Sequence, residues 1–416
     1  MKTLNYKYKT LFLYAIFLII SSFFFNDPVT IFNGLIKIIL EPDFLITDYV
    51  EVGGIGAAFF NAGILMVICI LFLYFLKTEL NGLSLASIWT VTGFGLFGKN
   101  IFNIWFIILG VYLYSRFQKE HFKKYIYIAL FGTTLSPLVT QIMFGLGNIT
   151  VLTIAFGTFM GIFIGFFLPP ISSYLLRVHQ GFSLYNIGFA SGIIGTIVIS
   201  TLRSYGFQSD ARIIWSSGNN FVFSILLFCI FSSMILIGLI LDPWCLKKLK
   251  KLYKYKGRLI TDFVSLEGYP ITLVNMGING IFSTIFVLLI RSSLNGPTIG
   301  AIFTIVGFSG FGKHIKNITP IMFGVMLAAT LSSFVGGPNI NSPAVVLSAL
   351  FSTTLAPIAG EFGILVGVIA GAIHYSVSLN VGYLHGGFNL YNNGFAGGIV
   401  ASIIIPVVES FKRSES

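Results

Sequence analysis

Two lysines each close a glycine-rich apolar segment, and these segments are the parts of the chain best suited to bind a solute. One segment runs over residues 90–100 and the other over residues 304–314. Closely spaced glycines weaken a helix by up to about 1 kcal/mol each and let a ligand or another backbone come close. The candidate substrate-binding residues are Gly93, Gly95, Gly98, Lys99, Asn100, Gly307, Gly310, Gly312, Lys313 and His314.

These segments favour a small anion, or a polar solute with an anionic group. A helix broken within a membrane frees backbone N–H and C=O groups, which must face protein or a wet cavity. Lys99 and Lys313 add a positive charge near each break, and the N-terminus of the next helix attracts negative charge. The structural alternative is that the glycines only allow close helix packing and that both lysines extend to the membrane surface.

A second duplicated pattern places tyrosine, asparagine and histidine near predicted helix starts. Tyr and Asn supply neutral hydrogen-bond donors and acceptors, and a histidine titrates near neutral pH. We therefore add four substrate-binding candidates, Tyr185, Asn186, Tyr391 and Asn392, and three proton-coupling candidates, His179, His374 and His385. The alternative is that these residues, except the membrane-embedded His374, are interfacial side chains and helix caps.

Two aspartates, Asp48 and Asp262, stand where helices are expected to begin. N-capping is the simpler interpretation, and binding of a cation or proton is the alternative. The three cysteines are not spaced like metal ligands. The sequence also lacks the glycine-rich nucleotide-binding loop that ends in Lys followed by Ser or Thr. We therefore expect no enzyme activity, no cofactor and no metal site.

The composition indicates that most of this chain lies in a lipid bilayer. The chain is 56% hydrophobic and only 9% charged, whereas soluble domains carry roughly 25% charged residues. We expect an all-α polytopic membrane protein of about 14 segments, each long enough to cross or enter a ~30 Å hydrocarbon layer. The predicted segments are 11–26, 56–76, 83–98, 101–115, 125–144, 150–169, 183–202, 217–241, 271–290, 297–312, 318–333, 342–359, 362–383 and 387–406.

The sequence also contains an internal duplication. Residues 45–50 return as 259–264 and residues 93–99 as 307–313, and further matched motifs follow in the same order. We therefore predict a first repeat over 1–216, formed by helix 11–26 with residues 45–202. The second repeat covers 217–416, formed by helix 217–241 with residues 259–406, and the basic loop 242–258 joins the two.

The two repeats are expected to have inverted topology, with a Gly-broken helix or re-entrant hairpin in each. An odd number of predicted crossings separates the copies, and it stays odd if segments 83–98 and 101–115 re-enter instead of crossing. Most of the 25 Lys and Arg residues fall on one side, so the positive-inside rule places both termini in the cytoplasm. The net charge of +11 is thus a signal of topology and not of nucleic-acid binding.

The two duplicated motifs carry a family resemblance. Gly-Phe-x-x-Phe-Gly-Lys (residues 93–99 and 307–313) and Gly-Phe-x-Leu-Tyr-Asn-x-Gly-Phe-Ala (181–190 and 387–396) resemble an uncharacterised bacterial membrane family with a duplicated domain of unknown function. The architecture is similar to the seven-plus-seven inverted-repeat transporters of nucleobases and of sulfate or bicarbonate, although their acidic substrate-binding residues are not evident here. The Tyr-Asn-x-Gly segments are similar to those of urea channels.

Together these observations favour a secondary transporter for a small polar or anionic solute, working by alternating access in a bacterial inner membrane. A passive channel for a small neutral solute and a non-transporting membrane scaffold are the alternatives. The expected partners are the lipid bilayer and a small solute, with no nucleic acid, and the sequence allows a homo-oligomer.

Overall fold

The chain is almost entirely helical. The computed structural model describes residues 6–207, 212–259 and 261–414. Ile260 of the duplicated motif and the predicted repeat ends, 1–5 and 415–416, lie outside the described residues. The helices before residue 208 are α1 (Tyr6–Phe25), α2 (Pro28–Leu40), α3 (Tyr49–Gly53), α4 (Ile55–Phe75), α5 (Gly82–Phe94), α6 (Ile104–Phe117), α7 (Ile126–Gly132), α8 (Ser136–Phe144), α9 (Val151–Val178) and α10 (Asn186–Ser204).

A corresponding series of helices follows in the second half. It comprises α11 (Asn220–Leu241), α12 (Leu246–Leu252), α13 (Phe263–Leu266), α14 (Tyr269–Leu289), α15 (Gly296–Phe308), α16 (Ile315–Phe334), α17 (Pro343–Phe351), α18 (Ala356–Phe362), α19 (Ile364–Val381) and α20 (Asn392–Ser414). The strands of the described chain are β1 (Ile46–Thr47) and β2 (Ile213–Ile214), which pair in parallel with Ile46 opposite Ile213.

The prediction of a helical multi-pass membrane protein is confirmed. Among the described residues, 11 helices are long and apolar enough to cross a membrane, counting α7–α8 and α17–α18 as one each. Four shorter apolar helices accompany them: α2, α5, α6 and α15. The sequence prediction missed α2 and ended α9 at residue 169. The helix instead continues through Pro169 and Pro170 to Val178. Prolines are tolerated in membrane-embedded helices because neighbouring groups can satisfy the freed backbone.

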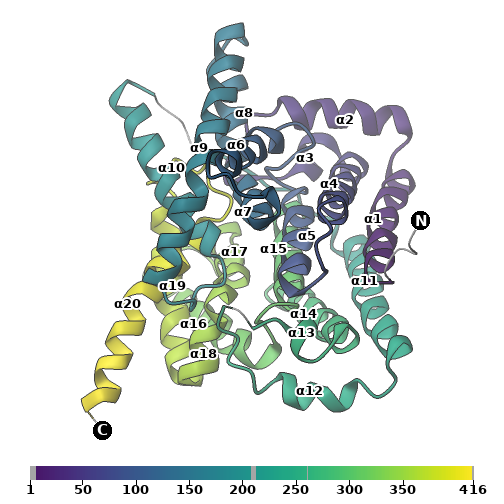
Figure 1. Ribbon diagram of the computed structural model, residues 1–416, viewed down its shortest axis with the longest axis vertical. Coiled ribbons are helices and arrows are strands. Elements are labelled where there is room, and N and C mark those ends of the chain that lie inside the picture. Colours follow the sequence, from purple (N-terminus) through teal and green to yellow (C-terminus); the bar gives the residue numbers. More distant parts are fainter. Residues whose placement is uncertain (1–5, 208–211, 260, 415–416) are drawn as a thin grey trace.

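The short helices α5 and α15 lie side by side at the centre of the molecule and run in opposite directions (Figure 1). Gly82 at the start of α5 touches Gly310, just beyond the end of α15. Gly296 at the start of α15 touches Leu96, just beyond the end of α5. Every residue of α15 is buried, and so is every residue of α5 except the half-buried Leu83, so the rest of the protein encloses most of this pair.

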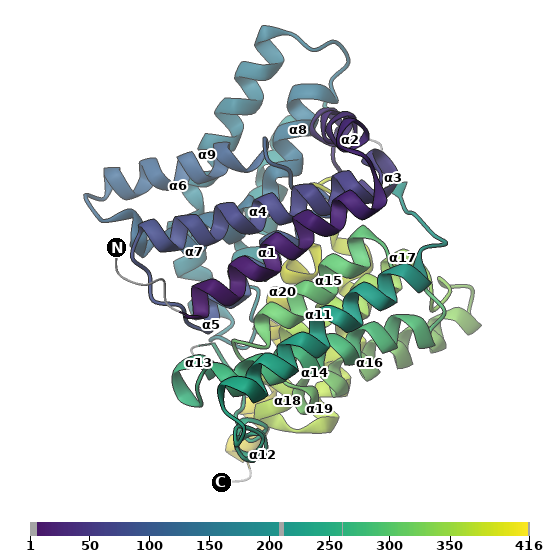
Figure 2. The ribbon, with the colours of Figure 1, turned by 90° about the vertical axis from the view of Figure 1, so that its right-hand side faces the viewer.

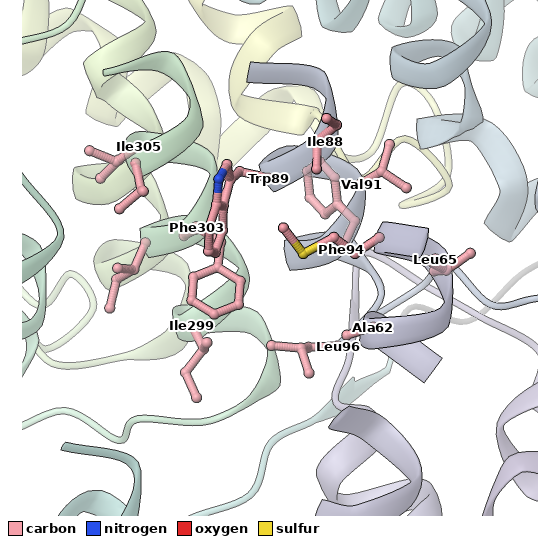
Figure 3. Close-up of a cluster of buried hydrophobic side chains, with 14 of the residues drawn as sticks. Ala62, Leu65, Ile88, Trp89, Val91, Phe94, Leu96, Ile299, Phe303 and Ile305 are labelled. Atoms are coloured by element: carbon pink, nitrogen blue, oxygen red, sulfur yellow. The ribbon is translucent and has the colours of Figure 1, made fainter. Parts of the chain in front are cut away.

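Glycine and aromatic side chains set the spacing of the two helices. A Cβ atom on Gly93 would lie 2.5 Å from the carbonyl oxygen of Gly300, so only glycine permits this approach. Beside this contact, Trp89 of α5 and Phe303 of α15 meet edge to face, with ring centroids 5.1 Å apart (Figure 3). Such aromatic pairs contribute about 0.5–1.5 kcal/mol beyond the area they bury. The packing role considered for Gly93 is therefore present.

Each half also supplies a carboxylate that caps the central helix of the other half. Asp262 Oδ1 accepts a hydrogen bond from the Gly82 N–H (2.8 Å), and Asp48 Oδ1 accepts one from the Gly296 N–H (3.1 Å). Asp48 Oδ2 accepts two more, from the N–H (2.9 Å) and hydroxyl (2.5 Å) of Ser216. The same carboxylates cap the short helices α3 and α13, as the sequence predicts. A carboxylate at a helix N-terminus satisfies free N–H groups and interacts favourably with the helix dipole.

The remaining long helices surround this centre. Helices α1 and α11 lie next to each other (Figure 2), and the hydroxyls of Tyr14 and Ser233 join them at 3.0 Å. Tyr6, at the start of α1, packs on Tyr269, and Gly238 near the end of α11 packs on Pro270. The start of α1 and the end of α11 thus meet the same turn of α14, so α1 and α11 are antiparallel.

We predict that Asp48→Ala destabilises the protein by at least about 3 kcal/mol. The substitution leaves the N–H of Gly296 and both donors of Ser216 without an acceptor in a buried place, and each unsatisfied buried donor costs roughly 1–3 kcal/mol. Thermal melting of the detergent-purified protein measures the loss. Asp27→Ala, at the exposed cap of α2, is the matched control and should lower the melting temperature far less. Equal losses in both variants would contradict the proposed cross-capping.

Candidate substrate site

Lys313 lies in the interior, just beyond α15, and is held by two hydroxyl groups. Its side chain is fully buried. Its Nζ donates hydrogen bonds to the hydroxyl of Tyr185 (2.5 Å) and to Thr353 Oγ1 (2.7 Å), and it stands 4.4 Å from the centre of the Tyr185 ring. The alternative in which this lysine extends to the surface is therefore excluded, because its side chain turns inward to partners on two other elements.

Lys99 occupies the equivalent place in the first half and is also fully buried, but it is not held. Its Nζ has no hydrogen-bond partner among the described residues and stands 4.9 Å from the centre of the Phe94 ring. The sequence counterparts of the two hydroxyl partners are Tyr391 and Thr133, and neither bonds to Lys99. The same pattern of one lysine, one tyrosine and one threonine thus forms a closed cluster around Lys313 and an open one around Lys99.

The two tyrosines meet at the centre of the molecule. The ring centroids of Tyr185 and Tyr391 are 5.0 Å apart. Each ring also packs at 4.8 Å on the last phenylalanine of a central helix, Tyr185 on Phe308 and Tyr391 on Phe94. The sequence-predicted tyrosines and lysines are therefore brought together around the ends of α5 and α15.

Breaks in two further helices hold the tyrosine segments. Short 3-10 turns interrupt α7–α8 at Thr133–Leu135 and α17–α18 at Ser352–Leu355. The Thr354 hydroxyl accepts from the N–H of Tyr185 (3.0 Å), and the Thr134 hydroxyl accepts from the N–H of Tyr391 (2.9 Å). Each tyrosine is thus positioned by a broken helix from the other half.

Two cavities of unequal size adjoin this centre, and they are lined by corresponding residues of the two halves. Cavity 1 has a volume of about 230 Å³ and cavity 2 about 100 Å³. Cavity 1 is lined by Phe131, Leu184, Asn186, Leu259 and Phe311, among others. Cavity 2 is lined by the sequence counterparts Phe351, Leu390, Asn392, Leu45 and Phe97, among others.

The two cavities lie at opposite ends of the α5–α15 pair. Leu259 and Phe311 are next to Asp262, which caps the start of α5, whereas Leu45 and Phe97 are next to Asp48, which caps the start of α15. Cavity 1 reaches both Tyr185 and Tyr391, and cavity 2 is lined by neither. In this conformation the tyrosine pair therefore lines the cavity at one end of the α5–α15 pair and not the cavity at the other end.

The histidine candidates are hydrogen-bond partners of asparagines. Nε2 of His179 lies 2.9 Å from Asn186 Oδ1, and Nε2 of His385 lies 2.9 Å from Asn392 Oδ1. His374 makes the corresponding contact to Asn393 at 3.0 Å. Burial lowers the pKa of His179, and it lowers the pKa of His385 to about 4. His179 and His385 are therefore neutral near pH 7 and fix the orientation of asparagines that line the cavities.

The other predicted site residues serve the backbone around the breaks. Gly98 and Gly312 have positive φ angles, +77° and +95°, which turn the chain after each central helix. Asn100 and His314 have hydrogen-bond partners other than the lysines: Asn100 bonds to the Tyr49 hydroxyl, and His314 bonds to the carbonyl of Tyr255. Packing positions against neighbouring helices are taken by Gly95, Gly307 and Gly310.

Two asparagines that the sequence reasoning assigned no role turn out to hold the breaks. Asn61 Nδ2 donates to the carbonyls of Gly95 (2.6 Å) and Lys99 (2.8 Å), and Asn275 makes the matching pair of bonds to Ser309 and Lys313 at 2.8 Å. Their duplication in the sequence was the signal that could have identified them. No group of three or more His, Cys, Asp or Glu residues in the described chain is placed to hold a metal ion.

The chain matches a protein family whose description gives no activity. A family model described as "Protein of unknown function (DUF1576)" matches residues 27–204 and again residues 241–410. The chain belongs to this family. The two matches agree with a duplicated domain and with the resemblance drawn from its motifs. Searches of curated proteins and of solved structures gave no match.

We predict opposite effects of the same substitution at the two lysines. Lys313→Met leaves the buried hydroxyls of Tyr185 and Thr353 without their donor, so it should destabilise the protein by about 1–3 kcal/mol. Lys99→Met removes a buried amine that has no partner, so its effect should be neutral or stabilising. Melting temperatures of the two variants in the same detergent give the comparison, and equal destabilisation would contradict the asymmetry.

Proposed function

We propose that this chain is a secondary transporter that moves a small polar or anionic solute by alternating access. The observation that supports this best is the pair of cavities lined by corresponding residues, of which cavity 1 reaches Tyr185 and Tyr391 and cavity 2 reaches neither. In alternating access, two similar halves exchange conformations, so that one route to a central site opens while the other closes. A conformation open on one side should then have matched but unequal cavities.

We further infer that the halves are inverted-topology repeats, with α5 and α15 as their broken helices. The antiparallel contacts of α5 with α15 and of α1 with α11 support this arrangement, as do the reciprocal caps from Asp48 and Asp262. The excess of Lys and Arg around α12 supports a cytoplasmic location for that end. Both termini would then be cytoplasmic in a bacterial inner membrane, and cavity 1 would open to the cytoplasm.

The lysine clusters supply a switch between the two conformations. Lys313 is bonded to Tyr185 and Thr353 in the present conformation, and the exchanged conformation would bond Lys99 to Tyr391 and Thr133 instead. In each conformation one buried amine lacks a protein partner, and a charged amine in an apolar interior is costly unless it is paired. An anionic group of the solute would supply that pairing, and this favours the anionic class.

A passive channel for a small neutral solute is the second candidate. It is favoured by the walls of cavity 1, which are mostly apolar, with neutral Tyr and Asn groups. A scaffold without transport activity is the third. A channel would leave both routes to the centre unchanged over time, whereas a transporter would open the two routes alternately.

Single cysteines at Leu45 and Leu259, which line cavities 2 and 1, distinguish these candidates. The three native cysteines are first replaced by alanine, and labelling by a membrane-impermeant maleimide is measured in open membranes. We predict that adding Lys313→Met, which removes the bonds of the present conformation, slows labelling at 259 and speeds it at 45. Lys316→Met, at an exposed lysine in the first turn of α16, is the control and should change neither rate. Parallel changes at both sites would favour the channel.

A thermal-shift screen of the purified protein against small anions and metabolites tests the solute class. A ligand at 100 times its dissociation constant should stabilise the protein by about 2.7 kcal/mol. We expect an anionic solute to give this shift and the Lys99→Met variant to lose it. A shift that survives the substitution would remove Lys99 from the site.

A further inference from the structure

One buried carboxylate breaks the similarity of the two halves. Asp43 lies between α2 and β1 and is fully buried. Its Oδ2 accepts hydrogen bonds from the hydroxyls of Tyr49 (3.0 Å) and Thr140 (3.0 Å) and from Asn103 Nδ2 (3.3 Å). Its Oδ1 is also buried and has no hydrogen-bond partner among the residues that the structure describes.

This environment favours the neutral form of the carboxyl group. A charged carboxylate with one oxygen unsatisfied in the interior is strongly penalised, whereas a proton on that oxygen removes the charge. Burial accordingly raises the pKa of Asp43 to about 8. Within the described part of the chain, the charged groups that act on it are Glu41, which raises the pKa further, and Arg212, which lowers it. These two form an ion pair with each other at the surface, and the other contacts of Asp43 are neutral.

The second half has no counterpart of this carboxyl group. Gly257 and Gly360 stand at the positions that correspond to Asp43 and Thr140. A Cβ on Gly257 would collide with the backbone oxygen of Gly312, and one on Gly360 with that of Lys256, so neither place has room for a side chain. Protonation of Asp43 therefore acts on the first half alone.

Hydrogen bonds connect Asp43 to the break that carries Lys99. Asn103, which donates to Asp43, also donates to the carbonyl of Gly98 at 3.2 Å. Tyr49, the second donor to Asp43, takes a bond from Asn100 Nδ2 at 3.4 Å, and its own N–H donates to the carbonyl of Leu96 at 3.1 Å. All three of these hydrogen bonds involve residues between the end of α5 and the start of α6.

We propose that Asp43 is a proton-binding site that couples protonation to movement of residues 96–103 and thereby to the position of Lys99. In the present conformation the neutral carboxyl stays buried and the segment is held. Loss of the proton leaves a charge that gains from reaching water, so it favours a conformation in which the segment has moved. A proton suits this place better than a metal ion, because the neighbouring groups are donors and supply no further oxygen ligands at the free Oδ1. The role in transport rests on the proposed function, but the binding of the proton does not.

Amide hydrogen exchange of residues 96–103, measured without any solute, tests this directly. After correction for intrinsic exchange, we expect the rate in the full-length protein to rise by up to about tenfold per pH unit below pH 8, because opening releases a proton there. The rate should level off above about pH 8, where the closed form is also deprotonated. Asp43→Asn, an isosteric mimic of the neutral form, should abolish this slope and keep the segment protected.

Two further variants separate the proton site from its surroundings. Glu41→Gln, in the exposed ion pair, is the matched control and should keep the slope. Thr140→Val removes a donor that stabilises the charged carboxylate, so the levelling-off should move to higher pH. A pH-independent rate in the wild-type protein, or an unchanged slope in Asp43→Asn, would overturn the proposal. Failure of the labelling experiment with these results intact would instead reject the transport function and leave the proton site in place.

Discussion

The structure depends on one reciprocal interaction, the capping of each central helix by a carboxylate from the other half. Without Asp262 the start of α5 loses an acceptor for its Gly82 N–H, and without Asp48 the start of α15 loses its own. Inside a bilayer no water is present to accept hydrogen bonds from free N–H groups. A short helix can therefore start there only where other parts of the protein accept those bonds. Because the two caps cross between the halves, neither central helix is complete without the opposite repeat. The centre therefore exists only where the repeats meet.

Around this centre, equivalent residues make different bonds. Lys313 is held by two hydroxyls, whereas Lys99 is held by none, although the residues that could bind it are present in the sequence. The cavities show the same inequality, with only the larger one reaching the tyrosine pair. Equivalent sequences that adopt unequal local conformations are what two exchangeable states of similar energy require. The carboxyl group of Asp43 adds a difference in sequence as well, and in the proposed mechanism its protonation would favour one state.

Much of the fold could be predicted, because its signals are local or duplicated. The long apolar runs located most of the helices, and the repeated glycine–lysine and tyrosine–asparagine motifs pointed to residues that the structure gathers at the centre. What could not be predicted depends on contacts between distant parts of the chain. Asp48 was recognisable as a local cap, but its bond to Gly296 joins residues far apart in sequence. The sequence also could not show that both lysines point inward. A lysine near a helix end has the same sequence signature whether it reaches the surface or the core. Asp43 gave no signal, since it belongs to no duplicated motif and stands among other acidic residues outside the predicted spans.

The measurement that tests alternating access most directly is a pair of electron-spin distance distributions in proteoliposomes. Labels at Leu45 and Ala344 report on the cavity 2 end, and labels at the sequence-equivalent positions Leu259 and Lys124 report on the cavity 1 end. Alternating access predicts two distance populations at each end, and a shift from pH 6 to pH 9 should change their weights in opposite senses at the two ends. One fixed population at both ends, unchanged by pH, would contradict it and would identify a static pore or a scaffold instead.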